Sequence, residues 1–131
     1  MKTLLTFFVL SLFIFSCSSN NDDTTKEENS ILGNWQLTAV FGSSGSSSNW
    51  TPIEDGYVYN FTNDGIIISD RFDCNGTYII DNNNINIKFQ CSDSSFNLSY
   101  DISYEENDLI LTPNPSPCDE GCAERYTKIN N

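Results

Sequence analysis

The fold is decided by residues 84–91, which read Asn-Ile-Asn-Ile-Lys-Phe-Gln-Cys. Apolar and polar side chains alternate along this segment, so one face is apolar and the other carries amides and an ammonium group. A period of two residues is typical of an antiparallel β-strand with one face in the core and one in water. Residues 96–105 repeat the pattern, with Phe96, Tyr100 and Tyr104 on the apolar face. The two segments therefore predict two strands joined by a short loop.

Weaker alternation continues through the rest of the chain after residue 30. It predicts six further strands, at residues 35–41, 57–61, 66–68, 76–80, 109–111 and 125–129. Most connections are short, and residues 63–65 (Asn-Asp-Gly) have the composition of a tight hairpin turn. Strands joined by short loops lie side by side and run antiparallel. Two connections, residues 42–56 and 112–121, are longer.

Eight meandering strands would leave two open edges unless the outermost strands pair with each other. Closure removes both edges, so we predict an all-β protein in which residues 31–131 form an eight-stranded antiparallel up-and-down β-barrel. A barrel with this number of strands is either filled by side chains or fitted to one small ligand.

The segment before the barrel predicts export. Lys2 precedes an apolar run at residues 4–15, which is the pattern of a signal peptide and is shorter than the ~20 residues that span a bilayer. Cys17 at the expected cleavage point resembles the lipobox of bacterial lipoproteins, in which the cysteine is lipidated and becomes the new N-terminus. We expect residues 1–16 to be removed and Cys17 to carry a membrane anchor. An ordinary signal peptide that contains a cysteine is the alternative.

Residues 17–30 are interpreted as a lipidated cysteine followed by a flexible tether, because residues 18–30 contain no apolar side chain. The acidic residues close behind Cys17 resemble a signal that sends some bacterial lipoproteins to the cell surface. We therefore expect an outer-membrane lipoprotein, anchored at the cell surface or on the periplasmic face.

Composition limits the possible functions. The chain has 6 basic and 18 acidic residues and a net charge of −12. This charge excludes nucleic acid, which needs a basic surface, and favours a cationic protein as a possible partner. The chain has no histidine, so neither a Ser-His nor a Cys-His couple exists. We predict a monomeric protein that is not an enzyme and uses no cofactor or metal.

Four cysteines follow the tether, and an even number in a small exported domain predicts two disulfides. If Ile80 faces Ile85 across a hairpin, Cys74 faces Cys91 at a Cβ separation of ~4.5–5.5 Å, which suits a disulfide. Cys74–Cys91 and Cys118–Cys122 are the favoured pairs. A crossed pairing between the hairpin and the C-terminal segment, or a zinc site made of the four thiolates, remains an alternative.

The first predicted strand contains Gly33-Asn34-Trp35, which resembles the Gly-x-Trp motif of the lipocalin family, especially the short lipocalin-like lipoproteins of Gram-negative bacteria. In that family the tryptophan closes the barrel base and an arginine of the last strand lies across it. The resemblance implies that Arg125 lies over Trp35, a contact that contributes about 0.5–2 kcal/mol. It also implies that residues 42–56 form a lid. The Thr-Asp-Tyr motif and the C-terminal helix of larger lipocalins are absent from this chain.

The predicted inward face is rich in aromatic rings, which suits a mostly apolar ligand pocket. Trp50, on the long loop, either caps this pocket or anchors its loop against the rim. Our first hypothesis is a membrane-anchored protein that binds a small apolar ligand. The alternative is a barrel with a solid core that binds a protein or a glycan through its loops, as an inhibitor module would. The other predicted lining residues are Tyr57, Tyr59, Phe61, Tyr78, Phe89 and Tyr100.

Overall fold

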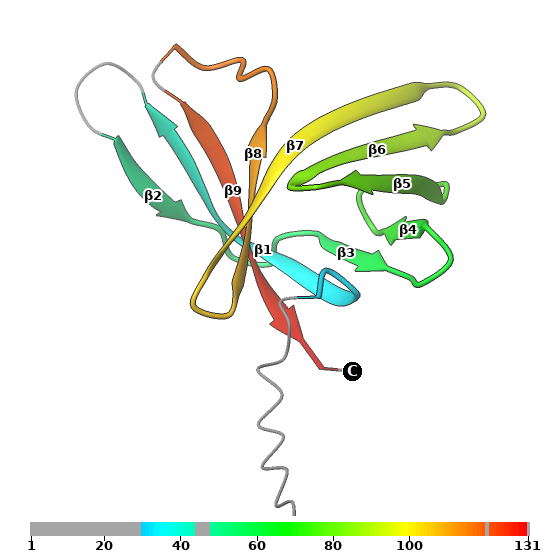
Figure 1. Cartoon of the computed structure of the whole chain (residues 1–131), viewed down its shortest axis with the longest axis horizontal. Coiled ribbons are helices and arrows are strands. Elements are labelled where there is room, and N and C mark those ends of the chain that lie inside the picture. Colours follow the sequence, from blue (N-terminus) through cyan, green and yellow to red (C-terminus); the bar gives the residue numbers. More distant parts are fainter. Residues whose placement is uncertain (1–29, 44–47, 120, 131) are drawn as a thin grey trace, which may run out of the picture.

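The computed structural model describes residues 30–43, 48–119 and 121–130, and in these residues it contains nine antiparallel strands (Figure 1). The same residues hold no helix that is long and apolar enough to cross a membrane. The strands are β1 (Gly33–Ser43), β2 (Ser48–Pro52), β3 (Val58–Phe61), β4 (Ile66–Ser69), β5 (Gly76–Asp81), β6 (Asn84–Gln90), β7 (Ser95–Glu105), β8 (Asp108–Pro113) and β9 (Cys122–Ile129).

The sheet closes on itself, because β1 pairs with β9 over most of its length. β1 and β3 to β9 form the barrel, and each strand lies beside the next one in the chain. The predicted eight-stranded up-and-down barrel is confirmed. Closure satisfies the backbone groups that an open meander would leave unpaired at its two edges.

β2 is an additional strand that the sequence prediction missed. Residues 42–56 were expected to form a lid, but residues 48–52 pair with the second half of β1, from Ala39 to Ser43. The reason is that β3 pairs only with residues 33–36 of β1, which leaves the rest of this long strand with a free edge. β2 extends the sheet along that edge and satisfies its backbone groups.

The β5–β6 hairpin has the predicted register, with Ile80 opposite Ile85 and Gly76 opposite Phe89. Cys74 and Cys91 lie directly beyond this last pair and form a disulfide with a Cα–Cα distance of 5.3 Å. Gly76 is required here, because a Cβ at this position would lie 2.8 Å from the Phe89 ring. The predicted pairing of these two cysteines is confirmed.

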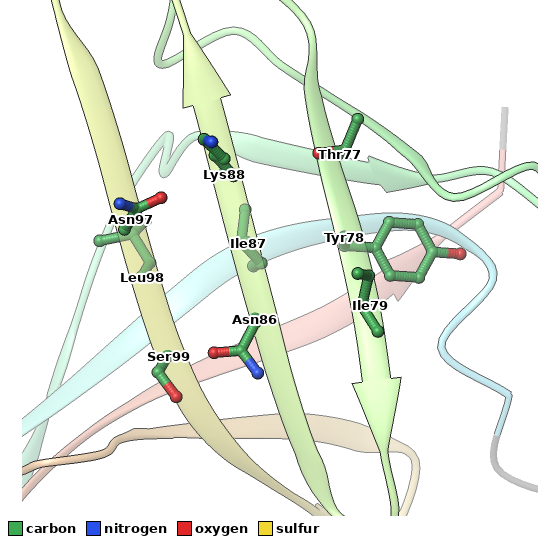
Figure 2. Close-up of a pocket in the computed structure, with 9 residues that line it drawn as sticks. All are labelled: Thr77, Tyr78, Ile79, Asn86, Ile87, Lys88, Asn97, Leu98 and Ser99. Carbon is green, nitrogen blue, oxygen red and sulfur yellow. The ribbon is translucent and has the colours of Figure 1, made fainter.

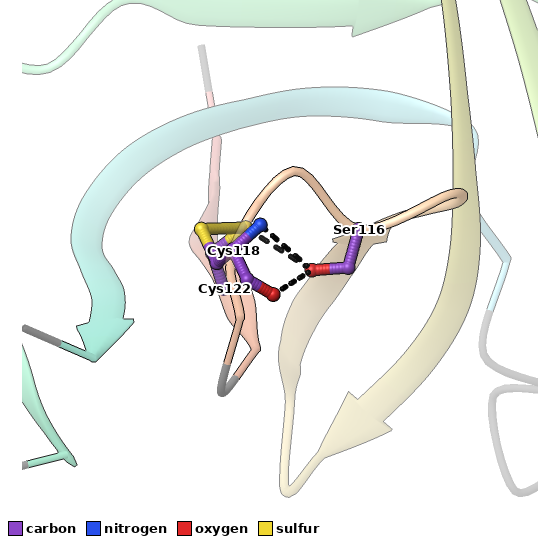
Figure 3. The surroundings of a disulfide bond; sticks show 3 residues. All are labelled: Ser116, Cys118 and Cys122. Carbon is purple, nitrogen blue, oxygen red and sulfur yellow. Dashed lines mark hydrogen bonds between the residues drawn. A yellow bond between two sulfur atoms is a disulfide. The ribbon is translucent and has the colours of Figure 1, made fainter. Parts of the chain in front are cut away.

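The second disulfide joins Cys118 to Cys122, with a Cα–Cα distance of 5.7 Å. It closes the loop between β8 and β9, where the Ser116 hydroxyl hydrogen-bonds to the backbone N–H and carbonyl of Cys118 (Figure 3). The crossed pairing and the zinc interpretation are therefore wrong, because each sulfur is already bonded to another sulfur.

Aromatic rings fill the middle of the barrel. The ring of Tyr59, which is fully buried, lies 5.9 Å from Phe61, 6.5 Å from Phe89 and 5.5 Å from Tyr126, measured between ring centroids. Such packing of rings stabilises a core beyond the burial of their area. The remaining buried members of the core are Ile31, Trp35, Leu37, Ile67, Ile85, Ile87, Tyr100, Leu109 and Leu111.

Trp35 lies at the barrel base with 2% of its surface exposed, and its Nε1–H donates to the carbonyl of Ile31 at 2.7 Å. The expectation that Arg125 lies across this ring is wrong. The register places Lys128 opposite Trp35, and its ammonium lies 5.3 Å from the ring centroid. Arg125 lies three residues earlier on β9, roughly 10 Å away along the strand. Gly33, the other residue predicted at the base, has a φ of 114°, a conformation that favours glycine.

Candidate functional site

Four tyrosines from three strands and one loop converge in the interior. Tyr59 lies on β3, Tyr100 on β7 and Tyr126 on β9, and Tyr57 directly precedes β3. The Tyr57 ring lies 5.1 Å from that of Tyr59 and 6.1 Å from that of Tyr126. Tyr100 belongs to the same buried core. We call these four residues the tyrosine cluster, and it lies toward the barrel end that carries the β4–β5 and β8–β9 loops.

A chain of hydrogen bonds runs through the cluster from a cation to a carboxylate. Tyr126 donates its hydroxyl proton to Oε2 of Glu124 at 2.6 Å. Because a phenol has one proton to donate, Tyr57 must be the donor in its 2.8 Å contact with the Tyr126 oxygen. Arg71 in turn donates from Nη1 to the Tyr57 oxygen at 3.1 Å. The direction of every bond in this chain is therefore determined.

Tyr59 differs from Tyr57 and Tyr126, because its buried hydroxyl has no hydrogen-bond partner among the described residues. Leaving a buried hydroxyl unpaired costs about 1–3 kcal/mol. Native proteins pair nearly all such groups, and an exception needs an explanation. The orphan hydroxyl is therefore the feature of this core that points most directly to an additional binding partner.

The cluster presents neutral phenols. Burial is the main cause that raises the pKa of Tyr57 far above its ordinary value, and electrostatic repulsion from Tyr59, once it is ionised, and from Glu124 adds to the shift. Burial also raises the pKa of Tyr100 and Tyr126, and Glu124 reinforces both shifts. A tyrosine ordinarily titrates near pH 10. The four side chains therefore offer hydroxyl groups rather than phenolates at neutral pH.

The β4–β5 loop, residues 70–75, covers this end of the interior. Its first residue, Asp70, accepts a hydrogen bond from the Val58 backbone N–H at 2.8 Å, and its other end is held by the Cys74 disulfide. Between these two attachments, the Arg71 guanidinium lies 4.9 Å from the centre of the Tyr57 ring. This loop lies over the tyrosine cluster, whereas residues 48–52 of the expected lid pair with β1.

Phe72 is the apolar part of the same loop. Its ring centroid lies 4.2 Å from that of Phe89 and 4.9 Å from that of Phe96. Phe72 is partly buried against the core, whereas Phe96 is 39% exposed. The loop is thus held by aromatic contacts as well as by the disulfide.

The remaining residues that were predicted to line the pocket differ in how deeply they are buried. Phe61 and Phe89 are buried beside the cluster tyrosines, and their contact with a ligand stays a prediction. Tyr78 is inward-facing but half-buried, and its hydroxyl donates to the Thr62 carbonyl at 2.5 Å, while its ring meets Phe61 edge-on. The Tyr78 hydroxyl is thus already paired, in contrast to that of Tyr59.

Trp50 lies on the outer wall, so of its two expected roles the structure favours the anchor and not the cap over the pocket. Its ring contacts Phe41 at 5.6 Å, and the Arg125 guanidinium lies 4.2 Å above it. Arg125 also pairs with Glu105, whose side chain is 58% exposed. The register irregularity between Leu37 and Ala39 changes the alternation of β1, and the rest of β1 and its partner β2 follow the changed pattern. Trp50 anchors the hairpin instead of capping the interior.

Sequence reasoning missed Arg71, Phe72, Glu124 and Tyr126. Arg71 and Phe72 lie in a loop, where periodicity carries no signal. Glu124 precedes the predicted strand at residues 125–129, and Tyr126 lies on the face opposite to Arg125, which the family resemblance placed inward. An inward carboxylate is tolerated because Tyr126 donates to it.

A shallow cleft of about 260 Å³ lies on β5, β6 and β7 (Figure 2). Ile79 is 71% exposed there and is surrounded by polar side chains such as Asn86 and Lys88. Elsewhere, Asp73, Cys74 and Cys91 are the one group of possible metal ligands among the described residues. The two cysteines of that group are bonded to each other, so neither supplies a thiolate.

A small closed antiparallel barrel with an aromatic interior defines the class of lipocalin-like proteins. A family model described as a lipocalin-like domain matches residues 31–129, and the chain belongs to this family. Members of the family are typically binding proteins rather than enzymes, and the barrel indicates a module for small ligands. No curated protein and no solved structure matches the chain.

Proposed function

We propose that this protein is a membrane-anchored binding protein that holds one small ligand, apolar over most of its surface, at the tyrosine cluster. The observation that carries the proposal is the buried Tyr59 hydroxyl, which has no partner among the described residues. A polar group of the ligand would supply that partner. The surrounding rings of Phe61, Phe89 and Tyr126 would contact its apolar body.

The route to the cluster is the β4–β5 loop. Arg71 is exposed, and its two aromatic contacts and one hydrogen bond exchange with water or ligand at little cost. Phe72 is the larger barrier, because its ring packs on Phe89. Asp70 and Cys74 hold the two ends of the loop, so the opening motion is confined to residues 71–73. The ligand would take the place of the Phe72 ring against the core.

The anchor is the second part of the proposal. Cys17 lies outside the described residues, and its lipidation is proposed from the resemblance of its surroundings to a lipobox. One acyl chain holds a protein only marginally, whereas two or more make attachment durable. We expect the modified cysteine to hold the barrel at the outer membrane.

Native mass spectrometry of the protein purified from its own membranes tests ligand binding. We expect a co-purifying mass and a saturable fluorescence increase with the apolar probe N-phenyl-1-naphthylamine. Tyr59→Phe should weaken retention of the co-purified ligand about 3–10-fold, which corresponds to one hydrogen bond. Tyr104→Phe, a half-buried tyrosine at the other end of the barrel, is the matched control and should change nothing. A protein that carries no ligand and does not bind the probe would contradict the proposal.

Fractionation of cells that produce Cys17→Ser tests the anchor. The variant should appear in soluble fractions with its barrel intact by circular dichroism, whereas Ser18→Ala should stay with the membrane. Membrane association of Cys17→Ser equal to that of the unmodified sequence would contradict lipidation at this residue.

A further inference from the structure

β7 has a stretch with a strand on one side only. β6 pairs with it from Ser95 to Asp101, but β8 pairs with it only from Tyr100 to Glu105. One more backbone bond joins the Asn114 N–H to the Ser99 carbonyl at 2.9 Å. Along residues 95–98, the outer edge of β7 therefore has no strand partner in the part of the chain that the structure describes. Figure 2 shows residues 97–99 beside β6.

The loop after β8 does not fill this edge. The β7–β8 ladder ends where Tyr100 pairs with Pro113, and the Asn114 N–H makes the last backbone contact, with the Ser99 carbonyl. Pro115 and Pro117 follow, and neither has an N–H to donate. Beyond Asn114, no backbone hydrogen bond joins the described part of this loop to residues 95–98.

The result is a preformed cleft of about 370 Å³ between the β7 edge and the proline segment. Leu98 and Tyr100 line it on the β7 side. The opposite wall keeps its shape because the Cys118–Cys122 disulfide closes the loop beyond the prolines (Figure 3). The cleft therefore has backbone donors and acceptors along one wall and apolar side chains on both.

Acidic residues lie close in the chain to the two segments that line the cleft. Asp101 lies at one end, where Asn114 donates to its two carboxylate oxygens at 3.0 and 3.1 Å. Asp93 precedes β7, Asp119 follows the prolines, and both are exposed. Lys88 is the nearby cation, and it lies on β6 opposite Asn97. The local charge is negative, as is the net charge of −12.

We propose that residues 95–98 of β7 bind an extended segment of a cationic polypeptide, which adds to the sheet as a further strand. Free strand edges are templates for strand addition, in which backbone hydrogen bonds supply affinity and side-chain pockets supply selectivity. The acidic residues favour a segment in which lysine or arginine alternates with apolar residues. A second copy of this chain would bring the same negative charge to the cleft and is repelled. The site is distinct from the Tyr59 hydroxyl and goes beyond the proposed ligand binding.

The test uses the full chain, labelled with ¹⁵N in detergent micelles, and the peptide acetyl-Lys-Val-Lys-Val-Lys-Val-Lys-amide. We expect amide resonances of residues 95–98 to shift and their hydrogen exchange to slow by at least tenfold. The same peptide with alternate backbone nitrogens methylated keeps its charge but has no N–H donors along one edge. It should bind at least tenfold more weakly than the unmethylated peptide. Equal binding of the methylated peptide, or shifts located elsewhere, would overturn the proposal.

Charge is tested separately. Asp93→Asn with Asp119→Asn should weaken binding of the peptide about 3–10-fold, whereas Asp81→Asn with Glu106→Gln, at the opposite end of the barrel, should leave it unchanged. Shifts at residues 95–98 that depend on protein concentration without peptide would identify a second copy as the occupant and overturn the proposal. Tyr59→Phe should leave peptide binding unchanged, so failure here and failure of the proposed ligand site are distinguishable.

Discussion

Two buried aromatic side chains that face each other across β1 and β3 differ in how their polar atoms are paired. Trp35 is almost fully buried, and its one polar atom is paired with the Ile31 carbonyl. Tyr59, which lies opposite it in the ladder, is equally buried, but its hydroxyl is unpaired among the described residues. The Trp35 side chain thus serves stability, with its polar atom satisfied. The tyrosine cluster keeps a costly unpaired group, which is expected where a protein binds something.

The largest loss of stability is expected for substitution of Trp35 at the barrel base. Trp35→Ala removes a buried ring and its hydrogen bond, and we expect the free energy of unfolding to fall by about 3–5 kcal/mol. Trp50→Ala is the matched control, because this ring is half-exposed on the outer wall and its contact with Arg125 contributes about 0.5–2 kcal/mol. Urea unfolding followed by circular dichroism measures both. Equal losses would show that the base has no special role.

The second largest loss of stability is expected from removal of the Cys74–Cys91 disulfide. Replacing both Cys74 and Cys91 by serine should lower the free energy of unfolding by about 3 kcal/mol, because the disulfide limits the unfolded chain. The Cys118–Cys122 disulfide closes a much shorter loop. Replacing both of its cysteines by serine should lower the free energy of unfolding by about 2 kcal/mol. Denaturant midpoints under non-reducing conditions give both values. A larger loss at Cys118–Cys122 would contradict the entropic account.

High pH should destabilise the tyrosine cluster. Burial raises the pKa of Tyr57, Tyr100 and Tyr126 in the folded protein, whereas the unfolded tyrosines titrate near pH 10. Above that pH the unfolded state has lost protons that the folded state keeps, so stability falls as pH rises. Each such tyrosine contributes up to about 1.4 kcal/mol per pH unit. Below pH 10 the cluster adds no pH dependence.

The measurement is the free energy of unfolding between pH 8 and pH 12. Tyr57→Phe with Tyr126→Phe should make its decline above pH 10 shallower. An unchanged slope in this double variant would show that the two hydroxyls do not titrate differently in the folded and unfolded states.

The smallest expected change in stability is the most direct test of the unpaired Tyr59 hydroxyl. Tyr59→Phe removes the unpaired hydroxyl and leaves the ring, so the ligand-free protein should keep its stability or gain up to about 1 kcal/mol. Tyr126→Phe removes a hydroxyl that both accepts and donates and should cost about 1–2 kcal/mol. Thermal unfolding of ligand-free protein compares them. A clear loss in Tyr59→Phe would mean that its hydroxyl has a partner in solution without ligand.

By itself, the amino-acid sequence determined the eight strands of the barrel, the closure of the sheet and one hairpin register. The alternation of residues 84–91 requires one buried face, and short turns leave a meander few other arrangements. The same register predicted the Cys74–Cys91 disulfide, since both cysteines continue the ladder beyond Gly76 and Phe89. These features are local, and they depend on residues that are close in the chain.

Tertiary structure alone decided which distant side chains meet. The register of β9 on β1 places Lys128 opposite Trp35, and beyond the irregularity between Leu37 and Ala39 it places Arg125 opposite Ala39, where its guanidinium lies over Trp50. No local pattern encodes that offset. Likewise, Arg71 reaches Tyr57 only because the β4–β5 loop is drawn across the barrel by a disulfide and an aromatic contact. Closing a barrel brings together strands that are far apart in sequence. The geometry of the site therefore depends on the register of every pair of neighbouring strands in the barrel.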